Sequence, residues 1–262
     1  MNSVRFSFDG PEALAAVTGR DGGVSTGDLA SLNLSFEVGD DTARVVANRK
    51  VAGDSLGFDF RELVVPRQVH GVRIKVVGEQ DRGRGADSAE LGVAACDALV
   101  TSTPNIPVAV LVADCAPVVL YDPTQPAIGI VHVGWRGAIG RIAQKTVETM
   151  AREFGSRPRD IKAGIGPCLQ PLSLEVSMNE AMQAEGEFHQ QPAVLYDAGD
   201  KPHLDIPFMV KQQLLDAGVW LKNIEDCRMD TLDARRFFSH RGQSGQAGRC
   251  MGVAMLRSPQ GT

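Results

Sequence analysis

The stretch that decides the fold is Ala95–Asp122, which reads ACDALVTSTPNIPVAVLVADCAPVVLYD. It predicts three strands, at 97–101, 107–112 and 117–121, separated by a Thr-Pro-Asn turn and by Asp114-Cys115. A fourth strand, AIGIVHV at 127–133, follows the Asp-Pro turn. Runs as apolar as these are typical of strands buried on both faces, so we expect them to form a central sheet.

Outside this stretch, apolar residues at helical spacing predict helices over 138–154, 179–188 and 206–217. Gly155 and Gly218 are suited to end the first and last of these helices. Shorter strands are predicted at 63–65, 72–77, 162–165 and 253–256, and the polar stretch 81–89 is expected to be a flexible, solvated loop. Strands and helices do not alternate with a strict Rossmann period. We therefore expect an α+β fold, with mixed β-sheets layered with flanking helices in a single compact domain, 1–262.

The composition limits the classes of function. The chain has 262 residues, is 43% hydrophobic and 23% charged, and carries a net charge of −5, which excludes disorder and argues against non-specific nucleic-acid binding. No run approaches 18 apolar residues, and the N-terminal segment does not resemble a secretory signal. The five cysteines include no C-x-x-C pair. We expect a reduced, cytoplasmic protein with no membrane partner. Oligomeric state cannot be derived from the sequence.

Three residues with metal-binding side chains stand at predicted strand ends. His70 follows PRQV, Cys115 interrupts the apolar run, and His132 closes the strand before GWRG. If those ends meet, they form a His₂Cys site with one position left for water, which suits zinc and also copper. The other interpretation is a small buried cysteine with two hydrogen-bonded histidines. Alternatively, Cys115 is a nucleophile with a histidine base, or Cys168 completes a closed structural site.

The segment GWRG, residues 134–137, stands where a strand meets a helix. Arg136 and the backbone N–H groups of a helix N-terminus could bind phosphate or a carboxylate. The alternative is a turn in which Arg136 makes a structural ion pair and Trp135 packs in the core. The zinc deaminase signature, the Walker A loop and the G-x-S-x-G elbow are all missing from the sequence.

Several motifs occur in an order that resembles a known family. They are GGVSTG (22–27), SLNL (31–34), GDD (39–41), NR (48–49), RQVHG (67–71), DALVT (97–101), ADCAPVVLYD (113–122), HVGWRG (132–137), GIGPC (164–168), FFSHR (237–241) and AGR (247–249). In this respect the chain resembles the YfiH family, also called the laccase-domain or multicopper polyphenol oxidoreductase-like family. Val133, Cys96 and Gly242 depart from the usual pattern, and Gly242 stands at a usually basic position.

The resemblance implies a zinc site formed by His70, Cys115 and His132, and activity on purine nucleosides. Family members use phosphate to cleave adenosine, inosine, guanosine or methylthioadenosine to base and ribose 1-phosphate, and some deaminate adenosine. Older assignments as copper-dependent polyphenol oxidases, and a role as amidohydrolases in peptidoglycan-precursor editing, are the alternatives. A laccase requires more imidazoles than the five present. On the phosphorylase hypothesis, the candidate residues for binding phosphate, orienting a histidine or moving a proton are Arg136, Arg49, Arg67, Arg241, Asp97 and Asp114.

Overall fold

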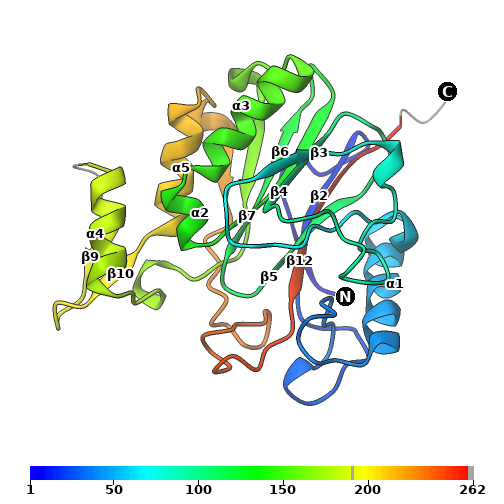
Figure 1. Cartoon of the computed structure of the whole chain (residues 1–262), viewed down its shortest axis with the longest axis horizontal. Helices are drawn as coiled ribbons and strands as arrows, with labels where there is room; N and C mark the ends of the chain where they lie inside the picture. The colour runs from blue at the N-terminus through cyan, green and yellow to red at the C-terminus, as the bar shows by residue number, and fades with distance from the viewer. Residues whose placement is uncertain (190–191, 259–262) are drawn as a thin grey trace.

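The computed structural model describes residues 1–189 and 192–258, so the predicted domain end at residue 262 lies outside the described residues. Two β-sheets lie face to face between helices (Figure 1). Helices α2 (Trp135–Ile139), α3 (Ile142–Phe154) and α5 (Ile206–Asp216) cover one outer face, and α1 (Thr42–Leu56) covers the other. The predicted α+β class with layered mixed sheets is confirmed.

The larger sheet has six strands in the order β11-β8-β6-β7-β4-β3. Its inner strands pair antiparallel, whereas β3 and β11 join its edges in parallel. The strands are β3 (Ile74–Val76), β4 (Ala98–Thr101), β6 (Ala116–Asp122), β7 (Ala127–Val133), β8 (Lys162–Ile165) and β11 (Ile224–Asp226). β6 and β7 are buried along their whole lengths, as continuous apolar runs require.

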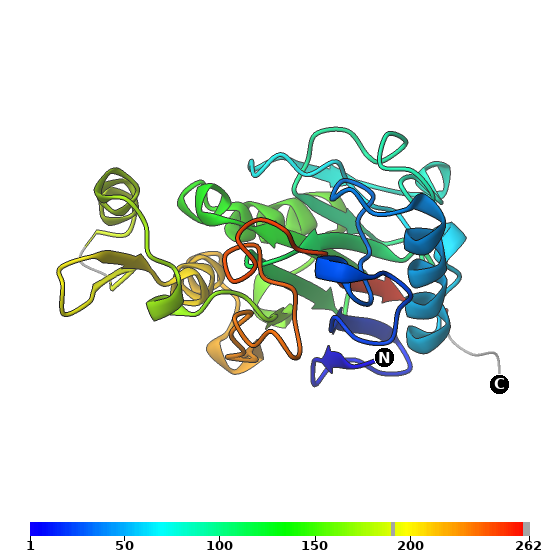
Figure 2. The same ribbon diagram turned by 90° about the horizontal axis from the view of Figure 1, so that it is seen from below.

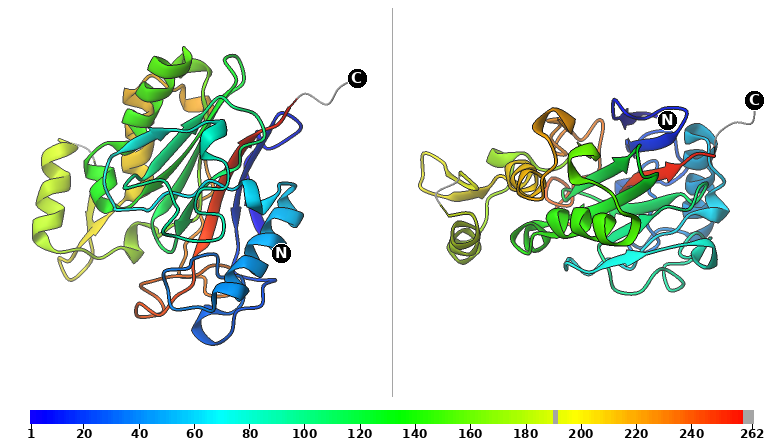
Figure 3. Two further views of the ribbon diagram at one scale, coloured as in Figure 1. Left: turned by 45° about the vertical axis from the view of Figure 1, so that its right-hand side comes forward. Right: turned by 90° about the horizontal axis from the view of Figure 1, so that it is seen from above.

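The smaller sheet has four antiparallel strands in the order β1-β2-β12-β5. They are β1 (Ser3–Arg5), β2 (Ala13–Thr18), β5 (Val108–Val112) and β12 (Cys250–Leu256). This sheet joins strands from the N-terminal part of the chain to the last strand, because β12 lies between β2 and β5 (Figure 3). The predicted strand 253–256 is therefore the second half of a longer strand.

Apolar side chains fill three layers of core. One cluster lies between the two sheets and includes Phe6, Val110 and Ile130. A second joins the outer face of the six-stranded sheet to α3 and α5, and a third joins the four-stranded sheet to α1. Because the sheets pack against each other and against helices, the ends of their strands and the loops that follow lie at the surface.

A small arm projects from the body of the protein (Figures 1 and 2). It consists of α4 (Met178–Glu187) and a hairpin of β9 (Val194–Tyr196) and β10 (Pro202–Leu204). Phe188 and Leu204 anchor it to the core beside α5. The helix begins with a capping box between Ser177 and Glu180, which satisfies backbone donors of its first turn.

Three further local predictions were wrong or incomplete, and one helix was missed. The helix over 138–154 is two helices, α2 and α3, because Arg141 has a left-handed backbone (φ 60°) and its guanidinium pairs with Glu187 and Asp216. Residues 63–65 form only an isolated bridge, Val64 to Val108. The loop 81–89 is packed, not freely solvated, since Arg49 donates to its carbonyl oxygens. Finally, α1 had not been predicted.

Within the described ranges, no helix has both the length and the apolar character needed to cross a membrane.

Candidate metal centre and pocket

Cys115 lies where the chain passes from the four-stranded sheet to the six-stranded sheet. β5 ends at Val112 in the four-stranded sheet, and β6 begins at Ala116 in the six-stranded sheet. Asp114 makes the turn between them with a left-handed backbone (φ 91°), which costs free energy for a non-glycine residue. Cys115 thus stands at the start of β6, beside the end of the antiparallel neighbour β7, where Pro117 pairs with His132.

His70 approaches the same point from the loop before β3. Its ring and that of His132 have centroids 4.7 Å apart and lie nearly perpendicular, at 83°. The potential ligand atoms of His70, Cys115 and His132 all lie within 4.8 Å of one another. His132 is buried, Cys115 is half-buried and His70 is exposed, so the group opens to solvent on one side. The structure therefore brings together the three predicted ligands, and this His-Cys-His group could bind a metal.

One carboxylate, that of Asp97, holds both histidines. It is fully buried and accepts from Nδ1 of His132 at 2.8 Å, which leaves Nε2 as the free ring nitrogen of that residue. It also accepts from three consecutive backbone N–H groups, those of Val69, His70 and Gly71, at 2.8–3.2 Å. The last three bonds fix the left-handed backbone of His70 (φ 56°). A carboxylate behind a histidine ligand is a common means of fixing its tautomer and orientation.

Electrostatics favour a thiolate at the centre of this group. Burial would raise the pKa of Cys115, but the charge and hydrogen bonds of His132 and His70 outweigh it and lower the pKa to about 6. Burial would likewise lower the pKa of His132, but the charge of Cys115 and the hydrogen bond with Asp97 raise it to about 9. Without metal, the two shifts favour a thiolate beside an imidazolium. A divalent cation fits this donor set, because it can replace the imidazolium proton beside the thiolate.

Gly134 allows these side chains to approach closely. A Cβ atom at this position would lie 3.1 Å from Sγ of Cys115 and 3.1 Å from Cδ2 of His70. Both contacts are shorter than ordinary van der Waals contacts. The glycine of HVGWRG therefore provides space for the His-Cys-His group.

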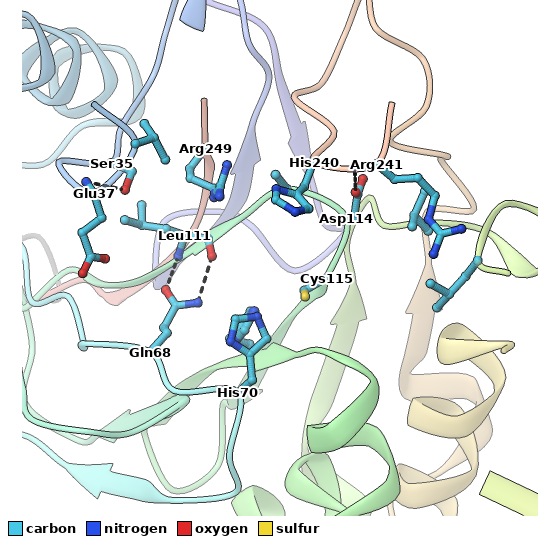
Figure 4. A pocket seen from close by; sticks show the side chains of 15 residues that line it. Ser35, Glu37, Gln68, His70, Leu111, Asp114, Cys115, His240, Arg241 and Arg249 are labelled. Carbon is cyan, nitrogen blue, oxygen red and sulfur yellow. Dashed lines mark hydrogen bonds between the residues drawn. The ribbon is translucent and has the colours of Figure 1, made fainter. Parts of the chain in front are cut away.

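A cavity of about 410 Å³ opens above the group, a size typical of small-molecule sites. Figure 4 shows Gln68 and His70 on one wall, and Arg249 and His240 on the facing wall. The amide of Gln68 is fixed by two hydrogen bonds with the backbone of Leu111, at 2.7 and 2.9 Å (Figure 4). Glu37 and Ser35 line the end of the cavity that is farther from Cys115.

Asp114 forms hydrogen bonds that hold in place the pocket wall formed by the C-terminal part of the chain. One carboxylate oxygen accepts from the hydroxyl groups of Thr231 (2.7 Å) and Ser239 (2.6 Å), and the other accepts from the backbone N–H of Arg241 (2.7 Å). The segment FFSHR is thereby attached to the turn that carries Cys115. The oxygens of both predicted aspartates, Asp97 and Asp114, thus accept hydrogen bonds from the surrounding protein.

The predicted arginines are not brought together. Arg49 is 1% exposed, and its guanidinium donates to the carbonyl oxygens of Leu34, Gly85 and Ala86. Arg136 is exposed and stacks on Trp135, 4.1 Å from the ring centroid. The two lie outside the pocket above the His-Cys-His group, and so does Arg67. Arg241 lines that pocket and donates to the carbonyl oxygen of Glu175.

The pocket residues that were not predicted include Glu37, Gln68, His240 and Arg249. Three of them belong to motifs that the sequence did show, namely Gln68 in RQVHG, His240 in FFSHR and Arg249 in AGR. Arg249 ends the AGR motif directly before β12, at the edge where β12 pairs with β5. The predicted strand began only at 253, so its place in the AGR motif was the available signal for Arg249.

Cys168, considered as a fourth ligand, is not part of the group. It is 1% exposed, and burial raises its pKa well above the usual value. Within the described residues the group has three members, which matches an open, catalytic kind of metal site better than a closed, structural one.

Fold and site together indicate an enzyme whose open His-Cys-His group could bind a metal. The chain matches the family described as "Multi-copper polyphenol oxidoreductase laccase" over residues 14–257, and it belongs to that family. It is 30% identical over 258 residues to purine nucleoside phosphorylase YlmD of Bacillus subtilis (strain 168), covering 92% of this chain and 87% of that protein.

Two further proteins are similar to this chain over nearly its whole length. Adenosine deaminase RL5, from an unknown prokaryotic organism, is 34% identical over 247 residues, covering 93% of each chain. The crystal structure of the Bacillus licheniformis hypothetical protein YfiH superposes with a TM-score of 0.91 at 33% identity, covering 96% of this chain and 99% of that one. The predicted family is confirmed.

Proposed function

We propose that this chain is a metal-dependent purine nucleoside phosphorylase that converts a purine nucleoside and phosphate to free base and ribose 1-phosphate. The observation that carries the proposal is the His-Cys-His group at the floor of a pocket large enough for a nucleoside. The family relationship and the name of the Bacillus subtilis relative support it. The five free cysteines fit a reduced, cytoplasmic location, which stays a prediction.

We propose zinc as the metal, held by His70, Cys115 and His132. Two imidazoles and a thiolate suit zinc, and three protein ligands leave a position for water or substrate. When bound, zinc supplies positive charge that polarises a substrate oxygen. Copper also suits this ligand set, but a laccase needs a blue site and a trinuclear centre, for which five histidines in the chain are too few.

The reaction sets clear demands on the pocket. Phosphorolysis breaks the bond between C1′ of the ribose and N9 of the purine, and forms a bond between C1′ and a phosphate oxygen. The electron pair of the broken bond leaves with the base, and the proton of hydrogen phosphate goes to the base nitrogen. Positive charge develops on the sugar, so the phosphate dianion must be held beside C1′.

The chain's own residues meet these demands by position. Asp97 orients His70 and His132 through its hydrogen bonds. We assign Asp97 and Asp114 to orientation, not proton transfer, because their oxygens already accept protein donors. Arg241 adds positive charge to the wall that Asp114 holds in place.

A metal-quantified assay tests the proposal. The protein is incubated with inosine or adenosine, with and without phosphate, and the products are separated by chromatography. We expect base and ribose 1-phosphate only when phosphate is present, about one zinc per chain, and loss of activity in Cys115→Ala. If Cys115→Ala retains phosphate-dependent cleavage, the ligand assignment is wrong.

The same assay examines a second activity, adenosine deamination, which the name of the RL5 relative favours. Inosine formed from adenosine without phosphate would establish it at this site. If neither nucleoside is converted, the amidohydrolase alternative becomes the better hypothesis, with Cys115 as nucleophile and peptidoglycan precursors as the next substrates.

A further inference from the structure

The pocket contains one arginine whose geometry differs from that of every arginine considered so far. Arg249 stands directly before β12 and lines the cavity above the His-Cys-His group. It extends from the wall opposite Gln68 and His70, with His240 beside it (Figure 4). Its side chain therefore faces the space in which a substrate would lie.

The guanidinium of Arg249 is fixed on one side only. Nη1 donates to the carbonyl oxygens of Ala247 (2.6 Å) and Gly248 (3.1 Å), and the backbone N–H donates to Oδ1 of Asn33 (3.0 Å). Within residues 1–189 and 192–258, Nε and Nη2 donate to no protein atom, and no carboxylate lies within ion-pair distance. One edge of the fork is thus held in place while the other remains available.

The other arginines lack this combination. All the donor nitrogens of Arg49 are used by backbone carbonyl oxygens. Arg136 stacks on an indole ring in solvent, outside the pocket. Arg241 lines the pocket but is exposed and donates to Glu175. Arg249 alone among these four is half-buried, anchored, and without a protein partner for Nε and Nη2.

We propose that Arg249 forms the subsite for the phosphate co-substrate, with Nε and Nη2 donating to two oxygens of one phosphate. The fork of a guanidinium matches two phosphate oxygens, and these charge-assisted bonds are strong in a partly buried site. His240, beside Arg249, provides a further donor on the same wall. A phosphate held there faces the His-Cys-His group across the pocket. This inference rests on the proposed function, because it assigns one of its two substrates.

Steady-state kinetics of variants test the subsite. We expect Arg249→Gln to raise the KM for phosphate by about 10- to 100-fold, the range for losing charge-assisted hydrogen bonds, with the KM for inosine changed less than about twofold. Arg249→Lys keeps the charge but not the fork, so its KM for phosphate should lie between those of Arg249→Gln and the unmodified protein. Arg235→Gln removes the same charge from a side chain that is 93% exposed and outside the pocket, and should leave both KM values unchanged.

Several results would overturn the subsite. One is an unchanged KM for phosphate in Arg249→Gln with zinc content and melting temperature preserved. Another is an equal rise in both KM values, which would mean a general disturbance of the pocket. A third is an Arg249→Gln variant that is no longer inhibited by inosine 5′-monophosphate but keeps its KM for phosphate. Arg249 would then bind the phosphate of a nucleotide and not the free co-substrate.

Calorimetric titration of the zinc-loaded protein with inorganic phosphate separates this inference from the proposed function. If the unmodified protein forms no ribose 1-phosphate, the proposed function fails. Phosphate binding that is lost in Arg249→Gln and kept in Arg235→Gln would still support the subsite. No binding to the unmodified protein, or equal binding to Arg249→Gln, would overturn it.

Discussion

At the scale of single residues, the proposed metal site depends on the close approach of its three ligands. His70, Cys115 and His132 come from three different segments, yet their ligand atoms lie within 4.8 Å of one another. Asp97 holds two of these segments, and Gly134 leaves space for Cys115 and His70. Small changes beside the ligands should therefore alter metal affinity more than overall stability.

Gly134→Ala tests this space. The new methyl group would lie 3.1 Å from both Cys115 Sγ and His70 Cδ2, so we expect at least a tenfold loss of zinc affinity, the lower end of the effect of disturbing the support around a metal ligand. Competition with a zinc chelator measures it. Gly186→Ala is the matched control, because nothing lies within 4 Å of its added methyl group. If the two variants bind zinc equally, the space at Gly134 does not determine the zinc affinity.

The charge of Cys115 gives a prediction for the metal-free protein. With a pKa of about 6, the thiol is protonated below that pH and is a reactive thiolate above it. We expect alkylation by iodoacetamide to increase through a midpoint near pH 6, and zinc to suppress it. Peptide mass spectrometry identifies the site, and the buried Cys250, whose pKa burial raises to about 12, serves as an internal control. Alkylation of Cys115 in the zinc-loaded protein would instead favour the nucleophile hypothesis.

At the scale of elements, loops at strand ends form the site while the strands themselves hold it rigid. β6 and β7 place Cys115 and His132 side by side because their register pairs Pro117 with His132. The facing wall comes from the segment 231–249, which has no long element of its own. Asp114 attaches that segment to the turn before β6.

Asp114→Asn should loosen this wall without removing a metal ligand. Asparagine tolerates the left-handed backbone of this position, but its NH₂ group would face one of the donors that now bind the carboxylate. We expect unfolding to require about 1.5–3 kcal/mol less free energy and the KM for phosphate to rise, with zinc content unchanged. Denaturant melts and steady-state kinetics measure these effects. A normal KM would mean that the wall is fixed by other contacts.

At the scale of the whole molecule, the two sheets form one unit. Gly164 of β8 packs against Phe6, which follows β1 in the opposite sheet, and a Cβ atom there would lie 2.4 Å from the phenylalanine ring. The N-terminal strands and the last strand meet in the four-stranded sheet, since β12 pairs with β2. Neither sheet can bury its inner face alone.

Gly164→Ala should therefore destabilise the whole chain. We expect a loss of about 1–3 kcal/mol, the usual effect of overpacking, with one transition in which far-UV circular dichroism and tryptophan fluorescence coincide. Trp135 packs against the cluster on the helical side of the six-stranded sheet and reports on it. Two separated transitions would mean that the sheets unfold independently, and the predicted single domain would be wrong.

Much of this molecule could be predicted along the chain. The strands at 98–101, 108–112, 116–122 and 127–133 follow from local apolar runs, and the ends of α3 and α5 follow from Gly155 and Gly218. The break between α2 and α3 could not be predicted, because it depends on Arg141 contacting Glu187 and Asp216, which are distant in sequence. Nor could α1, whose apolar residues show no strong helical periodicity.

The sequence by itself determined the residue types and strand ends that can form a His₂Cys group, and the family to which the chain belongs. Only the tertiary structure decided which charged residues surround that group. It buried Arg49 against backbone carbonyls, placed Arg136 outside, and brought Arg249 into the pocket. The physical reason is that an arginine can bind a substrate only where part of its guanidinium faces open space and does not already donate to the protein. Those conditions depend on chain segments that are far apart in sequence and meet only at the strand ends of the two sheets.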